Sequence, residues 1–429
     1  MPSTTAILAA IAAGTAALPS GAGAATVAVT QQTDTAAARI TALPGEDNHI
    51  TFSVSPLGAL IIRDPSAPLT PADGYCTATA PGELTCTGIT TPIGGLLVDV
   101  GDGDDVVDDS ATRLGITMDG GPGADTLLGG AGFDSISPGP GGRGDGDVLD
   151  GGAGRDVISY AARTTGVTIA LDDSMPSGEP GEGDKVTGFE VAEGGAGDDL
   201  ILGTDVAETI DGRAGADTIR GAGGDDVLIG SRGNDDLAGG DGADGLAGDA
   251  GDDRLSGGAG NDALYGGLGA DQADGGPGDD VLQVVGDPAA TKGETDGCGA
   301  GRDTVDSPAA FEALSAGCER VFIAVPGQDL QPVIVRPPLR AAPGGVLVPL
   351  TCDRQDGHGG CHVRLTVRVA GRRPLHASVT MKGGAKRTVR VPGARPARGT
   401  RVRVTIAGSA VYDGLRSPLR GGFTIPLAF

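Results

Sequence analysis

Single aliphatic residues recur every nine positions along the middle of the chain. Residues 194–283 divide without a slip into ten nine-residue units, and small or polar residues flank the aliphatic eighth position in most of them. The eighth positions are Ile201, Ile210, Ile219, Leu228, Leu237, Leu246, Leu255, Leu264, Ala273 and Leu282. This pattern predicts one very short strand per unit, with a single side chain turned inward. Units of this kind are expected to stack into a solenoid.

Glycine and acidic residues hold fixed positions in the same units. Every unit begins with glycine, and the fourth position is glycine in all units but one, where Val206 stands. Glycine at these positions allows positive φ and a close approach of the backbone to an ion. The sixth positions are Asp199, Glu208, Asp217, Asp226, Asp235, Asp244, Asp253, Asp262, Asp271 and Asp280. Stacked turns would bring these acids about 5 Å apart, where two charges repel by roughly 3 kcal/mol at an effective dielectric near 20.

Such a ladder of acids requires a cation between its members. Carboxylate and carbonyl oxygens, without nitrogen or sulfur donors, favour Ca²⁺ over zinc or copper. Four upstream blocks share the pattern, at 120–128, 129–137, 142–150 and 151–159, and they add Asp125, Asp134, Asp147 and Asp156 as candidate ligands. Glycine-rich disorder is the alternative that composition alone favours. Disorder gives no reason to keep acid at six and aliphatic at eight over ninety residues, so we expect an ion-binding solenoid.

The buried aliphatics of this solenoid are too few to order it alone. Nine aliphatic side chains spread over ninety residues stabilise the fold by less than the conformational entropy lost in ordering those residues. Metal binding is therefore expected to supply part of the folding free energy, which predicts an expanded repeat without the ion and a compact one with it.

Segments such as GGAGDDLIL (194–202) and GGPGDDVLQ (275–283) resemble the G-G-x-G-x-D-x-U-x nonapeptide of hemolysin-type (RTX) calcium-binding repeats of secreted bacterial proteins. The resemblance implies a parallel β-roll in which two nonapeptides form one coil and calcium lies between turns stacked on the same side. Asp199 would share an ion with Asp217, and Asp226 with Asp244, giving up to eight ions over ten units. Glu208 departs from the family aspartate beside Val206, so the second unit is a doubtful site.

Composition and charge divide the chain into unlike parts. The 429 residues include 79 glycines, no tryptophan and a formal charge of −26, which leaves little material for one large core. Residues 331–429 hold 17 basic and 3 acidic residues, so the acidic excess lies in the rest of the chain. This balance argues against nucleic acid or anionic lipid as a partner of the whole protein. The basic part could bind cell-surface or matrix polyanions, although a solvated surface is the simpler interpretation.

The N-terminal segment indicates export. Residues 1–24 read as a signal peptide, with an apolar run from Ala6 to Leu18 and a small-residue cleavage site at 22–24, although no Lys or Arg precedes the run. No later stretch is long and apolar enough to span a membrane. Six cysteines fall in three local couples, which predict disulfides in a secreted, extracellular protein: Cys76 with Cys86, Cys298 with Cys318, and Cys352 with Cys361.

The remaining segments complete the predicted organisation. We expect β-rich capping coils over 26–119, a first repeat block over 120–159, an insert with a solvated acidic loop over 160–193, the ten-unit roll over 194–283, a C-terminal cap over 284–323 and a Pro-rich linker over 324–345. Alternating runs between turns predict a small antiparallel β-sandwich over 346–429. Cys352, His358, Cys361 and His362 could hold zinc, but their spacing matches no zinc pattern and a disulfide is preferred.

No catalytic motif is present: the sequence has no H-E-x-x-H, no G-x-S-x-G and no G-x-x-x-x-G-K-[ST]. The favoured hypothesis is therefore a non-enzymatic, exported calcium-binding protein that presents a surface- or matrix-interacting module. The alternative is a secreted hydrolase or toxin that carries the calcium roll as an accessory and has its chemistry in residues 26–119, where His49 is the only histidine.

Overall fold

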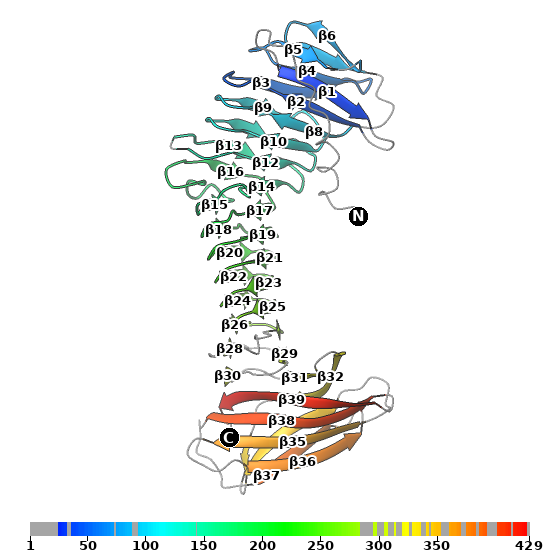
Figure 1. The fold of residues 1–429 in the computed structure, drawn as a ribbon, viewed down its shortest axis with the longest axis vertical. Coiled ribbons are helices and arrows are strands. Elements are labelled where there is room, and N and C mark those ends of the chain that lie inside the picture. The colour runs from blue at the N-terminus through cyan, green and yellow to red at the C-terminus, as the bar shows by residue number, and fades with distance from the viewer. Residues whose placement is uncertain are drawn as a thin grey trace.

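The computed structural model describes residues 25–31, 36–72, 74–87, 93–142 and 144–283, and after residue 283 it describes strands with few of their side chains. All secondary structure in these residues is β-strand, which confirms the all-β prediction. The strands stack along one long axis, with the N-terminal strands at one end and the C-terminal strands at the other (Figure 1). Among the described residues, no helix is long and apolar enough to cross a membrane. The predicted signal segment, 1–24, lies outside these residues.

Strands that pair partly antiparallel and partly parallel at the N-terminal end extend the two sheets of the solenoid. They are β1 (Ala25–Gln31), β2 (Ala36–Thr41), β3 (His49–Val54), β4 (Leu60–Arg63), β5 (Leu69–Pro71), β6 (Cys76–Ala80), β7 (Glu83–Cys86) and β8 (Ile93–Asp99). In one sheet β3 pairs antiparallel with β4 and parallel with β9 (Val106–Asp108), so this sheet continues directly into the stack. A disulfide joins Cys76 and Cys86 across β6 and β7, which confirms the first predicted couple.

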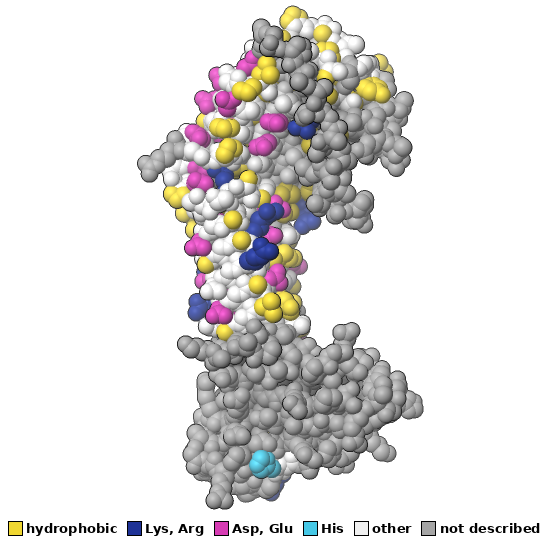
Figure 2. Space-filling view, viewed as in Figure 1, with side chains coloured by type: hydrophobic (Ala, Val, Ile, Leu, Met, Phe, Trp, Pro, Cys, Tyr) yellow, Lys and Arg dark blue, Asp and Glu magenta, His cyan; other side chains and the backbone are white. Residues whose placement is uncertain are grey.

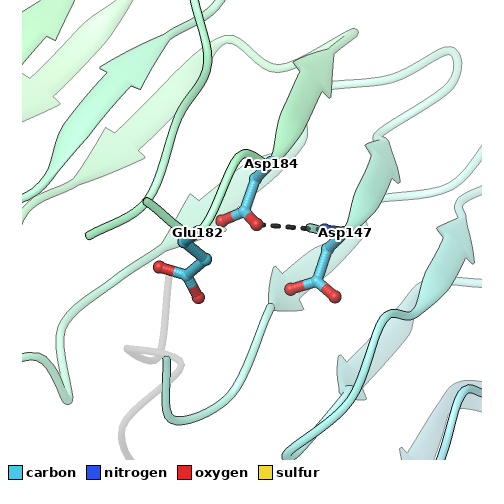
Figure 3. Close-up of side chains that lie close together, drawn as sticks. All are labelled: Asp147, Glu182 and Asp184. Atoms are coloured by element: carbon cyan, nitrogen blue, oxygen red, sulfur yellow. Dashed lines mark hydrogen bonds between the residues drawn. The ribbon is translucent and has the colours of Figure 1, made fainter. Parts of the chain in front are cut away.

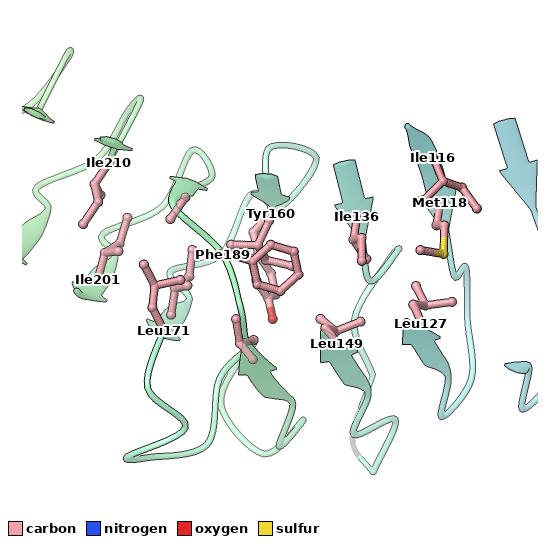
Figure 4. Close-up of a cluster of buried hydrophobic side chains, with 14 of the residues drawn as sticks. Ile116, Met118, Leu127, Ile136, Leu149, Tyr160, Leu171, Phe189, Ile201 and Ile210 are labelled. Carbon is pink, nitrogen blue, oxygen red and sulfur yellow. The ribbon is translucent and has the colours of Figure 1, made fainter. Parts of the chain in front are cut away.

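The first repeat block stacks on these strands in two parallel sheets. After β10 (Ile116–Asp119), which precedes the block, its strands are β11 (Thr126–Leu128), β12 (Ser135–Ser137), β13 (Val148–Asp150) and β14 (Val157–Ser159). One sheet runs β9–β11–β13 and the other runs β8–β10–β12–β14. Met118 and Ile136 from one sheet and Leu127 and Leu149 from the other form two rows of buried side chains along the core (Figure 4).

Residues 160–193, which the sequence predicts to be an insert, contribute strands to the same stack. β16 (Lys185–Thr187) pairs with β13, and β17 (Val191–Glu193) pairs with β14. β15 (Thr168–Ala170) begins a new sheet by pairing with β18 (Leu200–Leu202). The prediction of a solvated acidic loop is wrong for Glu182 and Asp184, which are 6% and 0% exposed. The reason is that Val186 and Ala192 supply buried inward side chains, although Glu179 and Glu182 stand where the motif has glycine.

The ten-unit region is a parallel β-solenoid with one strand per unit. After β18 come β19 (Thr209–Asp211), β20 (Thr218–Gly223), β21 (Val227–Ile229), β22 (Asp236–Asp241), β23 (Gly245–Ala250), β24 (Arg254–Ala259), β25 (Ala263–Leu268), β26 (Gln272–Asp274) and β27 (Val281–Gln283). Ile201 pairs with Ile219 and Ile210 with Leu228, so two nonapeptides form one coil of 18 residues. The eighth-position residues are at most 3% exposed. The predicted β-roll is confirmed.

Parallel pairing continues beyond residue 283. The later strands are β28 (Thr295–Gly297), β29 (Thr304–Ser307), β30 (Ala313–Leu314), β31 (Arg320–Val325), β32 (Gln328–Val335), β33 (Arg340–Ala342), β34 (Gly345–Cys352), β35 (Gly360–Val369), β36 (Leu375–Lys382), β37 (Lys386–Pro392), β38 (Arg401–Tyr412) and β39 (Leu415–Pro426). β28 and β29 stack in parallel on β26 and β27.

The segment 324–345 differs from the predicted Pro-rich linker, because β32 pairs with both β31 and β34. The pairing of β31 with β32 is irregular between Ile323 and Val325, near Pro332, since proline has no N–H to donate to a strand. The alternating runs that predict strands after residue 345 all lie within observed antiparallel strands, at 346–350, 363–369, 378–381, 388–391 and 401–406. The sequence did not predict β39. Their packing as a sandwich stays a prediction. The side chains of Cys298, Cys318, Cys352, Cys361, His358 and His362 lie outside those described, so the remaining disulfides and the zinc alternative stay untested.

Candidate metal centre

The sixth residue of each nine-residue unit lies on one of two edges of the roll. Asp199, Asp217, Asp235, Asp253 and Asp271 follow one edge, and Glu208, Asp226, Asp244, Asp262 and Asp280 follow the other. All ten side chains are at most 3% exposed. The upstream candidates Asp125, Asp134, Asp147 and Asp156 are equally buried. Figure 2 shows a roll surface drawn largely in white, with acidic, basic and hydrophobic side chains scattered over it.

Backbone hydrogen bonds hold these carboxylates in register. The amide nitrogen of Asp199 donates to Oδ1 of Asp217 at 2.8 Å, and the amide nitrogen of Asp217 donates to Oδ1 of Asp235 at 2.8 Å. On the other edge, the amide of Asp226 donates to Oδ1 of Asp244 at 2.9 Å. The pairs that the family resemblance implies are therefore neighbours in space, one coil apart.

The second oxygen of most of these carboxylates has no partner. Among the described residues, the buried atoms without a hydrogen bond include Oδ2 of Asp125, Asp156, Asp217, Asp226, Asp235, Asp244, Asp253, Asp262 and Asp271, and Oε2 of Glu208. A buried charged oxygen without a partner is costly, and a row of them in neighbouring turns adds repulsion. Each row of sixth-position acids therefore contains buried carboxylate oxygens that require a cation or a proton.

The first-position glycines leave room beside these oxygens. A Cβ on Gly221 would lie 2.3 Å from Oδ2 of Asp226 and 2.7 Å from the carbonyl oxygen of Gly239. A Cβ on Gly239 would meet Asp244 at 2.2 Å and the carbonyl of Gly257 at 2.6 Å. A carboxylate oxygen and a carbonyl oxygen facing one small space are the ligand types that calcium takes in proteins. The donor set contains oxygen only, so it fits Ca²⁺.

Burial disfavours the ionised form of these carboxyl groups when no cation is bound. Loss of hydration raises the pKa of Asp217 and Asp253 to about 7, and that of Asp262 to about 6, with repulsion from neighbouring acids adding to the effect. The same causes raise the pKa of Asp125 to about 7 and that of Asp156 to about 6. A bound divalent cation would reverse this shift, because it favours the charged form.

Three predicted residues differ from the rest. Asp134 and Asp199 use their second oxygen within their own turns, where Oδ2 accepts from the amide of Gly130 at 2.8 Å and of Gly195 at 2.7 Å. Glu208 bends back to its own turn, where Oε1 accepts from the hydroxyl and, at 3.1 Å, from the amide nitrogen of Thr204. Its longer side chain thus behaves differently from the aspartates, although its Oε2 still lacks a partner.

Sequence reasoning missed two members of the upstream ladder. Asp105 donates its amide to Oδ1 of Asp125 at 2.9 Å, and its own Oδ2 has no partner. Its signal was present, because Gly101, Gly103 and Asp105 hold positions two, four and six of a unit spanning 100–108. Asp184 accepts from the amide of Asp147 at 3.0 Å, but its unit, 179–187, lacks the glycines that would have revealed it.

Comparison with known proteins agrees with this geometry. A family model of the RTX calcium-binding nonapeptide repeat matches residues 119–158, 186–219, 202–237, 211–246 and 247–282. No curated protein matches the chain. The matched ranges contain both edges of the roll and most of the first repeat block. Residues 119–282 therefore contain several copies of the RTX calcium-binding nonapeptide repeat.

Proposed function

We propose that this chain is an exported, non-enzymatic calcium-binding protein whose roll folds as it takes up calcium between stacked turns. The observation that carries the proposal is the series of buried carboxylate oxygens that lack any partner in the described residues. The ligands would be the sixth-position aspartates together with backbone carbonyls, as at Gly239 beside Asp226. Glu208 would be the weakest member, because one of its oxygens is engaged by Thr204.

Calcium uptake would be coupled to folding of the roll. The core of each coil consists of only two aliphatic side chains, such as Ile219 and Leu228. The two turns of the same coil bring buried acids close to those of the neighbouring coils, which opposes folding. The ion would remove the repulsion between those acids and so supply free energy that the thin core lacks. Low calcium inside the cell would leave the roll loose before export, and extracellular calcium would then fold it.

The basic C-terminal part would be the module that the roll presents. Its 17 basic residues against 3 acidic ones suit a polyanionic surface outside the cell. Deletion of residues 346–429 is expected to abolish binding to such a surface while calcium uptake by the roll remains. Equal surface binding by the deleted and full-length proteins would contradict this role.

A matched pair of substitutions within the unit 239–247 tests calcium binding by the roll. Asp244 at position six is 2% exposed and has an unpartnered Oδ2, whereas Asp241 at position three is exposed. Asp244→Asn should lower the number of calcium ions bound in calorimetry, and Asp241→Asn should leave it unchanged. Equal stoichiometry in the two variants and the wild type would overturn the assignment of the sixth position.

A further inference from the structure

Three buried carboxylates converge where one sheet of the solenoid ends and another begins. Asp147, Glu182 and Asp184 each offer an oxygen within 4.8 Å of the others. Figure 3 shows the three side chains around a common space beside β13 and β16. They are 2%, 6% and 0% exposed. We call these three residues the junction cluster.

The junction cluster differs from the gaps of the repeats in its third carboxylate. Asp147 and Asp184 are stacked sixth-position residues, since the amide of Asp147 donates to Oδ1 of Asp184 at 3.0 Å. Glu182 stands at position four of the unit 179–187, which is glycine in nearly every other unit, so its carboxylate enters the gap. Gly178 leaves the adjoining space open, because a Cβ there would lie 2.4 Å from Oε2 of Glu182 and 2.7 Å from Oδ2 of Asp184.

The charge of the cluster is only partly compensated. Arg163 donates from Nη2 to Oε1 of Glu182 at 2.7 Å, and it is the one cation in the described residues that an ion pair joins to the cluster. Tyr160 donates its hydroxyl to Oδ2 of Asp184 at 2.7 Å and is neutral. When all three carboxylates are ionised, the single guanidinium leaves two negative charges in a buried space, which is the charge that one divalent cation would neutralise.

A group other than an acid also indicates a ligand here. The Arg163 side chain is 3% exposed and points into the cluster, yet its Nε and Nη1 have no hydrogen-bond partner among the described residues. Buried donors of this kind require acceptor oxygens. Water molecules carried by a bound ion would supply such oxygens beside the guanidinium, whereas an additional proton on a carboxylate would not.

We propose that the junction cluster is a separate binding site for a hard divalent cation, of the calcium class, built by Glu182 and Asp184 with Asp147. Its ligands are oxygen only, which disfavours zinc and copper. Calcium affinity rises with the number of charged ligands, so this site would fill before the repeat gaps, which have fewer carboxylates. The bound ion would join β13 to β16 and fix the turn from which the next sheet starts. Because Asp147 and Asp184 also belong to the upstream ladder, this site rests on the function proposed for the repeats, and Glu182 is the ligand that it adds.

Terbium(III) luminescence tests the site directly, because terbium takes the place of calcium and is excited by a nearby tyrosine. Tyr160 contacts the cluster, so the first equivalent of terbium added to the full-length protein should give sensitised emission. Tyr160→Phe should abolish that emission while calorimetry still detects the ion. Tyr265→Phe, which alters an exposed tyrosine in the roll, should retain it.

Glu182→Gln is expected to weaken binding of this first ion at least about tenfold, because one charged ligand is lost. Glu179→Gln is the matched control, since Glu179 lies 3.9 Å from Arg163 but outside the cluster. Arg163→Met should tighten binding by removing a like charge. The proposal is overturned if the wild type shows no early sensitised ion, or if Glu182→Gln and the wild type bind it equally.

The same titrations separate this proposal from the function of the repeats. If Asp244→Asn loses ions and Glu182→Gln loses none, the repeat assignment stands and the junction site is excluded. Arg163→Met could bind an early ion that the wild type does not bind. The guanidinium alone would then neutralise the cluster in the wild type, and the site would likewise be excluded. Loss of the early ion in Glu182→Gln, with Asp244→Asn unchanged, would support the junction site and contradict the repeats.

Discussion

Glycine at position four of a repeat unit lies directly against the backbone of the preceding coil. A Cβ on Gly233 would be 1.4 Å from the carbonyl oxygen of Gly215, and one on Gly251 would be 1.5 Å from that of Gly233. No side chain fits at such a distance, so this glycine is a condition for stacking. A side chain is tolerated at Val206 because the preceding turn on that side, Gly188–Glu190, is three residues long instead of six. Its side chain is accordingly 56% exposed.

Substitution of Gly233 by alanine should therefore disrupt the roll at that coil. We expect a loss of about 3 kcal/mol or more in stability with calcium present, since the carbonyl of Gly215 cannot move without breaking the ladder. Thermal unfolding followed by circular dichroism measures this loss. Gly245→Ala is the control, because a Cβ there has only the carbonyl of Asp226 nearby, at 3.9 Å. Equal melting temperatures for the two variants would contradict the stacking argument.

At position two of the unit, replacement of another residue by glycine is expected to stabilise the roll. Ala222 has φ of 76°, and Ser231 also has φ of 76°, whereas Gly258 and Gly276 hold this place in later units with φ of 110° and 90°. The left-handed conformation costs a non-glycine residue about 1–2 kcal/mol, and glycine loses about 0.5–1 kcal/mol of chain entropy in return.

Ala222→Gly should therefore stabilise the calcium-loaded protein by about 0.5–1 kcal/mol. A rise in melting temperature is the expected readout, and the exposed side chain of Ala222 means that little contact is lost. Ala238→Gly, in the interior of β22 without positive φ, should lower the melting temperature instead. A fall for both variants would show that the conformation of position two is not strained.

The strands show which elements the sequence could predict and which it could not. The period of nine and the alternation at positions seven to nine were sufficient for β18 to β27, because each strand has one buried hydrophobic side chain and a fixed phase. The nine-residue pattern could not be recognised in the unit 179–187, where Glu182 replaces glycine and Pro180 stands near the start. Burial of Asp184 depends on stacking against Asp147, 37 residues earlier, and no local pattern reports such a contact.

The same reasoning explains which ligands were found. Asp217 and Asp244 were predictable because the motif surrounds them, whereas the divergent behaviour of Asp199 depends on the amide of Gly195 in its own turn. A carboxylate with a second partner inside its turn has the same sequence signature as one without. The number of unpartnered oxygens is therefore a property of the folded turns and could not be counted from the repeat alone.

At the level of the N-terminal hairpins, the disulfide between Cys76 and Cys86 links neighbouring strands at a paired position. A cross-link closing a loop of this length contributes about 3 kcal/mol through the unfolded chain. The double variant Cys76→Ser/Cys86→Ser should show faster hydrogen exchange in β4, β6 and β7. Exchange in β20 to β25, which contact none of these strands in the ladder, should be unchanged. Uniform acceleration along the whole chain would contradict this local role.

For the whole molecule, the acidic charge and the fold are linked through protonation. The pKa values of Asp217, Asp253 and Glu208 are raised to about 7 in the folded roll, because burial disfavours their charged form. Acids in an unfolded chain titrate near pH 4. The folded state therefore binds protons more strongly than the unfolded state, so this contribution to stability is complete below about pH 4 and is lost as pH rises through about 7.

In calcium-free buffer, the full-length protein should consequently be more stable at pH 5 than at pH 8. Adding calcium at pH 8 should restore the β signal in circular dichroism, and at pH 5 it should add much less, since protons already occupy the oxygens that the ion needs. Sodium chloride at high concentration is the control, because it screens exposed charges but not the buried ladder. If salt at pH 8 restores the roll as well as acid does, surface repulsion governs its folding. If calcium-free protein is no more stable at pH 5 than at pH 8, the buried carboxylates do not hold the apo roll open.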